Sequence, residues 1–239
     1  MRIALLLAAL FTVVAPAENP VQILTTGLFH QDEFKAEAGP DWWGIFPEGE
    51  GFTLQPAPVT VTIEQDGIMD NDNEKTGRVV NVPQKTRPVL LLRGLPNLTE
   101  GPLDAAELPA GRNFLYPGQH LSLSSGPDKR VAPMGVTAFG SARDDTVWGN
   151  VFFHDYQFRL ITGRHPNNTT QAVGNIDPFV LDGIPHLVWA GDIDRDGNFD
   201  LLFDFTDHYN KRHYVLFVSS AAKEGELVGK VAELVTTGC

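Results

Sequence analysis

The segment Gly191-Asp192-Ile193-Asp194-Arg195-Asp196-Gly197-Asn198-Phe199-Asp200 leads directly into Leu201-Leu202-Phe203-Asp204-Phe205. The apolar residues 201–205 predict a buried strand, and residues 187–189 predict another strand just before the acidic segment. Residues 213–218 form a nearly continuous apolar run, as expected for a strand in the middle of a sheet. Residues 227–234 predict a last strand or a short helix. We therefore expect residues 185–239 to form a four-stranded antiparallel unit in which an acidic loop joins the first two strands.

The acidic loop has the spacing of a site for a hard cation. Its aspartates stand at positions 1, 3, 5 and 9, with a glycine at position 6. Calcium takes six to eight oxygen ligands at roughly 2.3–2.6 Å, and a loop with carboxylates at positions 1, 3 and 5 can curl around it. The glycine permits the sharp turn, and position 7 offers its backbone carbonyl. The predicted calcium ligands are Asp192, Asp194, Asp196, Asn198 and Asp200. The alternative is an acidic turn that binds nothing, although its carboxylates would then repel one another.

The same residues, read as G-D-I-D-R-D-G-N-F-D-L-L-F, resemble the cation loop of FG-GAP repeats, which build the blades of integrin-type β-propellers. The Asp-x-Asp-x-Asp-Gly-x-x-Asp core also occurs in dockerin-type and thrombospondin-type loops. A strand after the last aspartate favours the propeller-type loop, since a helix would follow in dockerin. The resemblance implies that the loop holds calcium and that the ion makes the hairpin rigid. It covers about 50 residues, and residues 173–177 are at best a faint second copy. A single blade-like unit joined to other β-structure is therefore expected.

The rest of the chain is also predicted to be β-structure. Residues 52–63 read as one strand, because Val59, Val61 and Ile63 alternate with threonines. No long segment keeps the 3.6-residue period of an amphipathic helix. We expect a mostly β protein of antiparallel sheets, either sandwich-like or partly propeller-like. Residues 18–93 form an N-terminal β-rich region and residues 94–184 a middle one, beginning with a connection that contains three prolines. Together with residues 185–239 they are expected to form one domain.

The N-terminus and the overall charge indicate a compartment. Residues 1–17 have the form of a signal peptide, with a basic start, an apolar stretch and the small-residue site Ala15-Pro16-Ala17. Export to the periplasm or the extracellular space is expected, without stable membrane insertion after cleavage. Cys239 is the one cysteine, so no internal disulfide can form. The formal charge of −12 and the lack of a Lys/Arg cluster argue against nucleic-acid binding.

Other residues are weaker candidates for chemistry. Trp42-Trp43 could form a carbohydrate-stacking or protein-contact surface, although one ring of such a pair more often caps a core. Asp70-Asn71-Asp72-Asn73-Glu74 could hold a weaker calcium, but a solvated hairpin loop is the preferred interpretation. The histidines at 154, 208 and 213 are expected at turns, and no hydrolase motif accompanies them. Glycosylation sequons begin at Asn97, Asn167 and Asn168.

The sequence thus predicts an exported, calcium-binding, β-rich protein with a binding or structural role and an unknown protein or glycan partner. The alternative is a secreted hydrolase, for example one that acts on glycans, in which calcium is structural. The ligand, the oligomeric state, a second cation at residues 70–74, the role of Cys239 and the use of the sequons stay open.

Overall fold

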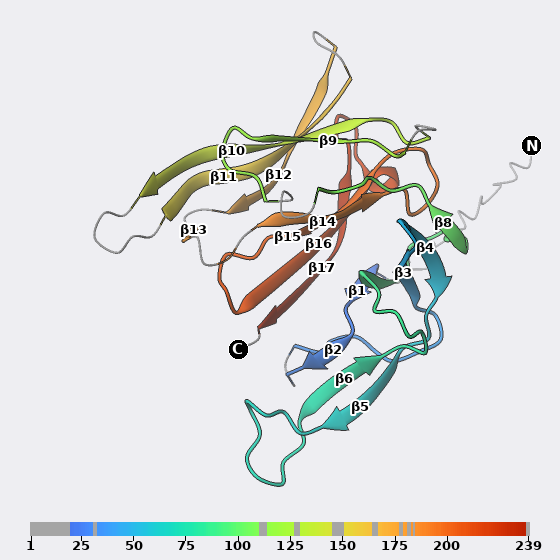
Figure 1. Ribbon diagram of the computed structural model, residues 1–239. Coiled ribbons are helices and arrows are strands. Elements are labelled where there is room, and N and C mark those ends of the chain that lie inside the picture. Colours follow the sequence, from blue (N-terminus) through green and yellow to red (C-terminus); the bar gives the residue numbers. More distant parts are fainter. Residues whose placement is uncertain are drawn as a thin grey trace, which may run out of the picture.

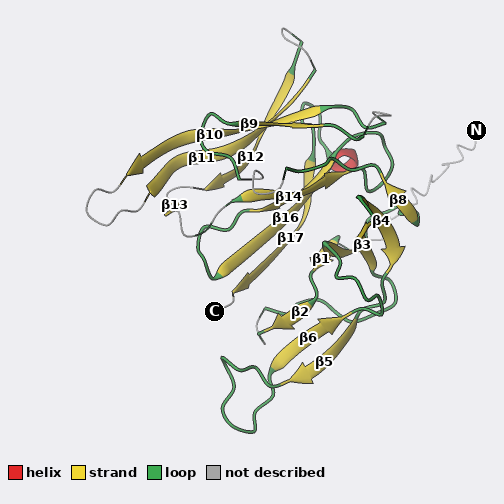
Figure 2. Cartoon of the chain, in the orientation of Figure 1, coloured by secondary structure: helices red, strands yellow, loops and turns green. Residues whose placement is uncertain are grey.

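The computed structural model describes residues 20–30, 33–109, 114–126, 130–144, 151–163, 167–176, 179–180, 183 and 185–237. The expected signal peptide and Cys239 lie outside these residues. The described chain is almost entirely strand, with one short 3₁₀ turn, η1 (Ser219–Ala221) (Figure 2). All strand pairs within it are antiparallel. Among the described residues, no helix is long and apolar enough to cross a membrane.

The N-terminal half contributes two sheets. The first has the order β1-β7-β3-β4-β8 and the second the order β2-β6-β5. The strands of the first sheet are β1 (Gln22–Leu24), β3 (Trp43–Glu48), β4 (Gly51–Pro56), β7 (Leu90–Arg93) and β8 (Gly101–Leu103). Those of the second are β2 (Gly27–Phe29), β5 (Thr60–Glu64) and β6 (Gly77–Asn81).

The C-terminal half contributes the other two sheets. One has the order β12-β11-β10-β9, with β13 also paired to β11, and the other is the meander β14-β15-β16-β17. The strands of the former are β9 (His120–Leu123), β10 (Met134–Asp144), β11 (Val151–Thr162), β12 (Thr169–Ile176) and β13 (Phe179–Val180). Those of the meander are β14 (His186–Gly191), β15 (Asp200–Asp204), β16 (Lys211–Val218) and β17 (Gly229–Thr237). The meander confirms the predicted C-terminal four-stranded antiparallel unit, and its last element is a strand.

The meander is the central layer of the molecule, because apolar side chains leave it on both faces. Leu201 and Phe203 of β15 pack into a core shared with β9–β12, whereas Leu202 between them packs into a core shared with the first N-terminal sheet. On β16, Phe217 and Leu216 divide in the same way. Figure 1 shows the meander between the β9–β12 sheet and the N-terminal strands. The continuous apolar run of β16 therefore reflects burial on both faces.

The first N-terminal sheet also separates two cores. Leu90 and Leu92 of β7 face the meander, and Leu91 faces a third core closed by the β2-β6-β5 sheet. Four sheets thus follow one another with three apolar cores between them (Figure 1). The fold is mostly β and antiparallel, as the sequence predicts, and each neighbouring pair of sheets is sandwich-like.

Two local predictions were wrong. Residues 52–63 form two strands, because Pro56 ends β4, Pro58 lies in the gap before β5, and a proline cannot donate a ladder hydrogen bond. His154 and Asp155 lie within β11, where the register shifts opposite the Gly140 region, so they begin no turn.

The preferred interpretation of the Trp42-Trp43 pair, in which one ring packs into a core, is confirmed. Trp42 is fully buried, and Trp43 is half-buried in β3.

Candidate metal site

The acidic loop is the connection between the first two strands of the central sheet. The ladder of β14 and β15 ends at the pair Gly191 and Asp200, so the residues between them form one closed loop. Gly197 has a φ of +85°, in the left-handed region that glycine adopts without strain. It thus serves the turn for which the sequence predicted it. Arg195, with a φ of +63°, adopts the same region at a cost that the surrounding structure has to offset.

Three of the predicted ligands converge. Asp192, Asp194 and Asp200 each offer one carboxylate oxygen, and these oxygens lie within 4.8 Å of one another. Asp192 and Asp200 are 6% and 0% exposed, and Asp194 is half-buried. The Oδ1 atom of Asp194 is buried and has no hydrogen-bond partner among the described residues. A buried carboxylate oxygen without a donor is costly unless something positive binds it.

Asp192 holds the loop in its curled form. Its Oδ1 accepts a hydrogen bond from the backbone N–H of Asp196 at 3.0 Å, and its Oδ2 accepts one from Gly197 at 2.9 Å. Burial raises the pKa of Asp192, and the nearby carboxylates of Asp196 and Asp194 raise it further against those two hydrogen bonds. Asp192 therefore shapes the loop and also lies close to the negative carboxylates of Asp194 and Asp196.

Asp200 connects the loop to the far end of β16. Its Oδ2 accepts a hydrogen bond from the backbone N–H of Ile193 at 2.7 Å, and its Oδ1 accepts the backbone N–H of Ser219 at 2.8 Å. Burial raises the pKa of Asp200 to about 7, because its charged form has lost most of its water. A bound cation is the kind of neighbour that would favour the ionised form.

The other two predicted ligands are on the loop but outside the group of three carboxylates. Asp196 is exposed, and its two oxygens accept hydrogen bonds from the backbone N–H of Asn198 at 2.8 Å and from the Ser219 hydroxyl at 2.8 Å. Asn198 is exposed as well. Asp196 therefore ties the loop to η1 in this structure.

Two serines of η1 complete the surroundings of the loop, and sequence reasoning missed them. The Ser219 hydroxyl contacts Asp200 as well as Asp196, and the Ser220 hydroxyl is hydrogen-bonded to Oδ2 of Asp194. These serines follow β16, two strands later in the chain. No local sequence pattern identifies these serines as part of the site, because it is the fold of the meander that brings η1 next to the loop.

The segment after β8 also supports the loop. Ala105 forms a β-bridge with Gly191, and the backbone N–H of Asp192 donates to the carbonyl of Asp104 at 2.9 Å. Arg195 reaches further back and donates to the carbonyls of Pro102 and Thr99, each at 3.2 Å. The loop thus joins the central sheet to the N-terminal half.

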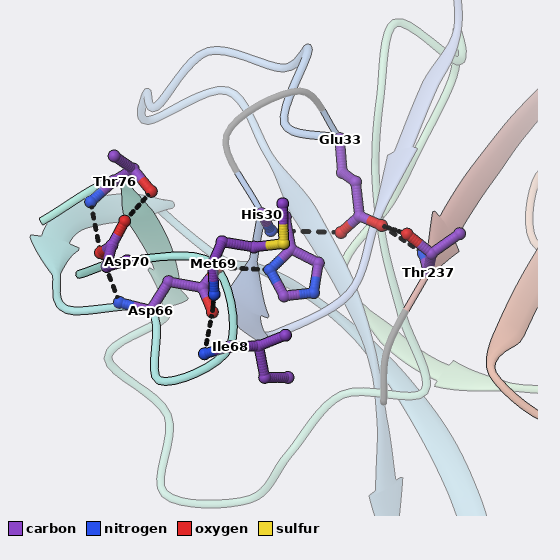
Figure 3. A network of polar contacts seen from close by, with 8 residues as sticks. All are labelled: His30, Glu33, Asp66, Ile68, Met69, Asp70, Thr76 and Thr237. Carbon is purple, nitrogen blue, oxygen red and sulfur yellow. Dashed lines mark hydrogen bonds and ion pairs between the residues drawn. The ribbon is translucent and has the colours of Figure 1, made fainter.

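The second acidic stretch is organised by its own side chains (Figure 3). Oδ2 of Asp70 accepts backbone hydrogen bonds from Asp66 at 2.7 Å and from Thr76 at 2.8 Å, and its Oδ1 is bonded to the Thr76 hydroxyl. Asp66 is fully buried and pairs with Nδ1 of His30. Asp66 was not singled out in the sequence analysis. Asp70 therefore serves to close the loop between β5 and β6.

Two further described histidines contact polar side chains near the meander. His213 contacts Glu233 through Nε2 at 3.0 Å, and His208 is hydrogen-bonded to Asn210 in the turn before β16. The carboxylate group of the β14–β15 loop is the one potential metal cluster among the described residues. Comparisons with protein-family models, with curated proteins and with solved structures gave no match.

Proposed function

We propose that this protein binds one calcium ion in the loop of residues 192–200 and that the ion has a structural role. The observation that carries the proposal is the convergence of Asp192, Asp194 and Asp200, with one buried oxygen of Asp194 left without a donor. Oxygen-only ligands on a flexible loop suit calcium better than zinc, which prefers nitrogen and sulfur ligands. Asp196 and the carbonyl of Asn198 would complete the coordination after a small rearrangement.

The arrangement around the loop supports a structural role. The loop joins two strands of the sheet that two cores share, and it contacts η1 and the segment after β8. An ion there would hold these segments together and would bind the folded chain only. The same meander supports the proposed resemblance to an FG-GAP blade, present as a single unit.

Export and a binding role are proposed on the same basis. Extracellular calcium is millimolar, so a site with a Kd near 10⁻⁴ M, of order that of extracellular modules, would be occupied there. The sequence of residues 1–17 supports export. No arrangement of the described histidines and carboxylates favours the hydrolase alternative.

The test is thermal unfolding of residues 18–239 in EGTA, in calcium and in magnesium. At a hundredfold excess over Kd the ion adds about 2.7 kcal/mol, which corresponds to a rise in Tm of roughly 5–10 °C for a chain of this size. Calorimetric titration is expected to give one calcium per chain, and magnesium to bind more weakly because it demands octahedral geometry.

Asp194→Asn keeps the shape of the side chain but removes its charge. It should abolish most of the calcium-dependent rise in Tm while changing the Tm in EGTA little. Asp72→Asn, in the exposed loop between β5 and β6, is the matched control and should respond to calcium as the parent does. A parent protein whose Tm is the same in EGTA and in calcium would refute the proposal.

A further inference from the structure

We propose that the cleft between β12 and the β16–β17 side of the meander binds an extended peptide. The peptide would add to β12 as an antiparallel strand, with an acidic carboxyl-terminal end beside Lys223. This site lies on other strands than the acidic loop, and the proposal does not depend on calcium.

The first support is that β12 is an edge strand. It pairs with β11 and with no other described strand, so one row of its backbone N–H and C=O groups has no strand partner. Such an edge is a template for another extended chain, and many proteins bind peptides in this way. Residues 169–176 contain no proline, Lys or Arg, three residue types that often protect an edge, although β12 does carry one β-bulge.

The second support is a cleft that follows this edge. It has a volume of about 670 Å³, and its lining includes every residue of β12 from Gln171 to Ile176. The opposite wall is formed by β16 and the start of β17. Ligand sites usually have volumes of about 300–1,000 Å³. A peptide placed here would lie along the edge of β12.

The base of the cleft is apolar. Phe205, Val215 and Phe217 line it from the face of the meander that packs against the β9–β12 sheet. Gly174, the bulge residue of β12, has a φ of +65°, and a Cβ there would lie 2.4 Å from the Phe205 ring. The glycine lets β12 approach the aromatic base closely. Every second side chain of an added strand would point toward this base.

The two ends of the cleft differ. At one end the Gln171 amide bonds to the backbone of Leu227 and Val228 at 2.7–2.9 Å and closes the space between β12 and β17. Lys223 lies at this end, is exposed, and its ammonium has no partner among the described residues. Glu226 also lines this end and accepts a hydrogen bond from the backbone N–H of Lys223 at 3.1 Å.

At the Ile176 end the lining includes Asp207, which is paired with the Lys211 ammonium at 3.0 Å.

This polarity sets the direction of the peptide. β12 runs from the Gln171 end to the Ile176 end, so an antiparallel partner enters beside Asp207 and leaves beside Lys223. Its carboxyl-terminal end therefore meets the free ammonium. Residues 171–176 extend over about 20 Å, the length of a six-residue strand. The preferred ligand is a hexapeptide that alternates apolar and polar residues and has an acidic last residue.

The experiment is fluorescence anisotropy of the full chain with a fluorescein-labelled peptide of sequence Lys-Val-Thr-Val-Thr-Glu. We expect saturable binding that Lys223→Glu weakens about fivefold or more, since the substitution places like charges together. Lys85→Glu, an exposed lysine that does not line the cleft, is the matched control and should leave binding unchanged. A peptide with proline at its two valine positions should not bind, because it lacks strand N–H donors.

Hydrogen exchange provides a second measurement that does not depend on a protein variant. Bound peptide should slow the exchange of amides within residues 171–176 and leave those of β9 unchanged. The proposal is overturned by the absence of saturable binding, by equal binding to Lys223→Glu, or by equal binding of the proline peptide. It is also overturned if octanoate displaces the peptide at similar concentration, which would assign the cleft to a small amphipathic carboxylate. Concentration-dependent dimerisation that buries β12 would assign it to a second copy.

Discussion

Asp200 and Asp66 are both fully buried aspartates, yet their pKa values move in opposite directions. The pKa of Asp200 rises because burial dominates over its hydrogen bonds, whereas that of Asp66 falls, chiefly because the His30 side chain is bonded to it. Asp66 thus has its partner within the protein. The carboxylates of the β14–β15 loop have no cationic side chain in their group, which is the residue-scale reason to expect an external cation.

The lowered pKa of Asp66 predicts a pH dependence of stability. The folded state keeps Asp66 ionised more readily than the unfolded chain, whose ordinary value is 3.8. This contribution is present above that value and is lost as the pH falls through the lower, folded-state pKa. Asp66→Asn should therefore lower the Tm at pH 7, and its deficit should shrink on acidification below about pH 4.

Thermal melts between pH 7 and pH 2.5 measure this difference. Asp72→Asn, at an exposed position of the same loop, should follow the parent throughout. A deficit for Asp66→Asn that stays constant over the whole pH range would contradict the assignment of the stabilisation to the ionised carboxylate of Asp66.

At the scale of the elements, β15 has the most complete burial. All five of its residues are buried, and its leucines and phenylalanine divide between two cores. The sequence pattern of residues 201–205 predicted this strand well, because a strand buried on both faces shows as a continuous apolar run. The sequence predicted β4 and β5 poorly. The alternation of Val59, Val61 and Ile63 was joined to residues 52–58 as one strand in spite of the two prolines between them.

Leu202→Ala is therefore expected to be strongly destabilising. The side chain is 0% exposed between the central sheet and the first N-terminal sheet, so truncation leaves a cavity and should cost about 2–5 kcal/mol. Val235→Ala on β17 of the same sheet, with 44% exposure, should change stability by no more than about 0.5 kcal/mol. Urea unfolding measures both. Equal effects of the two substitutions would mean that Leu202 is not in a packed core.

At the scale of the whole molecule, the four sheets share their cores. The meander contributes to two cores and the first N-terminal sheet to two, with one core common to both. Melting of one sheet therefore exposes apolar surface on its neighbour. We expect the described chain to unfold as one cooperative unit, in agreement with the predicted single domain.

Tryptophan fluorescence can test this cooperativity. Trp42 lies in the core farthest from the β9–β12 sheet, and Trp189 lies in the core between the meander and the first N-terminal sheet. Two variants that each keep Trp42 or Trp189 as the one tryptophan, with the other three tryptophans of the chain replaced by phenylalanine, should report the same unfolding midpoint. Far-UV circular dichroism should coincide with both. A separate, earlier transition of Trp42 would show that the N-terminal sheets form a domain of their own.

The sequence by itself determined the β class, the C-terminal meander and the acidic loop with its glycine turn. These features are local: the strand period, the continuous apolar run and the spacing of Asp192, Asp194 and Asp200 can all be read within one hairpin. Only the tertiary structure decided the contacts of Ser219 with the loop, the His30–Asp66 pair and the cleft beside β12. Each of these joins segments that are distant in the chain, and their proximity depends on how whole sheets stack, which no local pattern encodes.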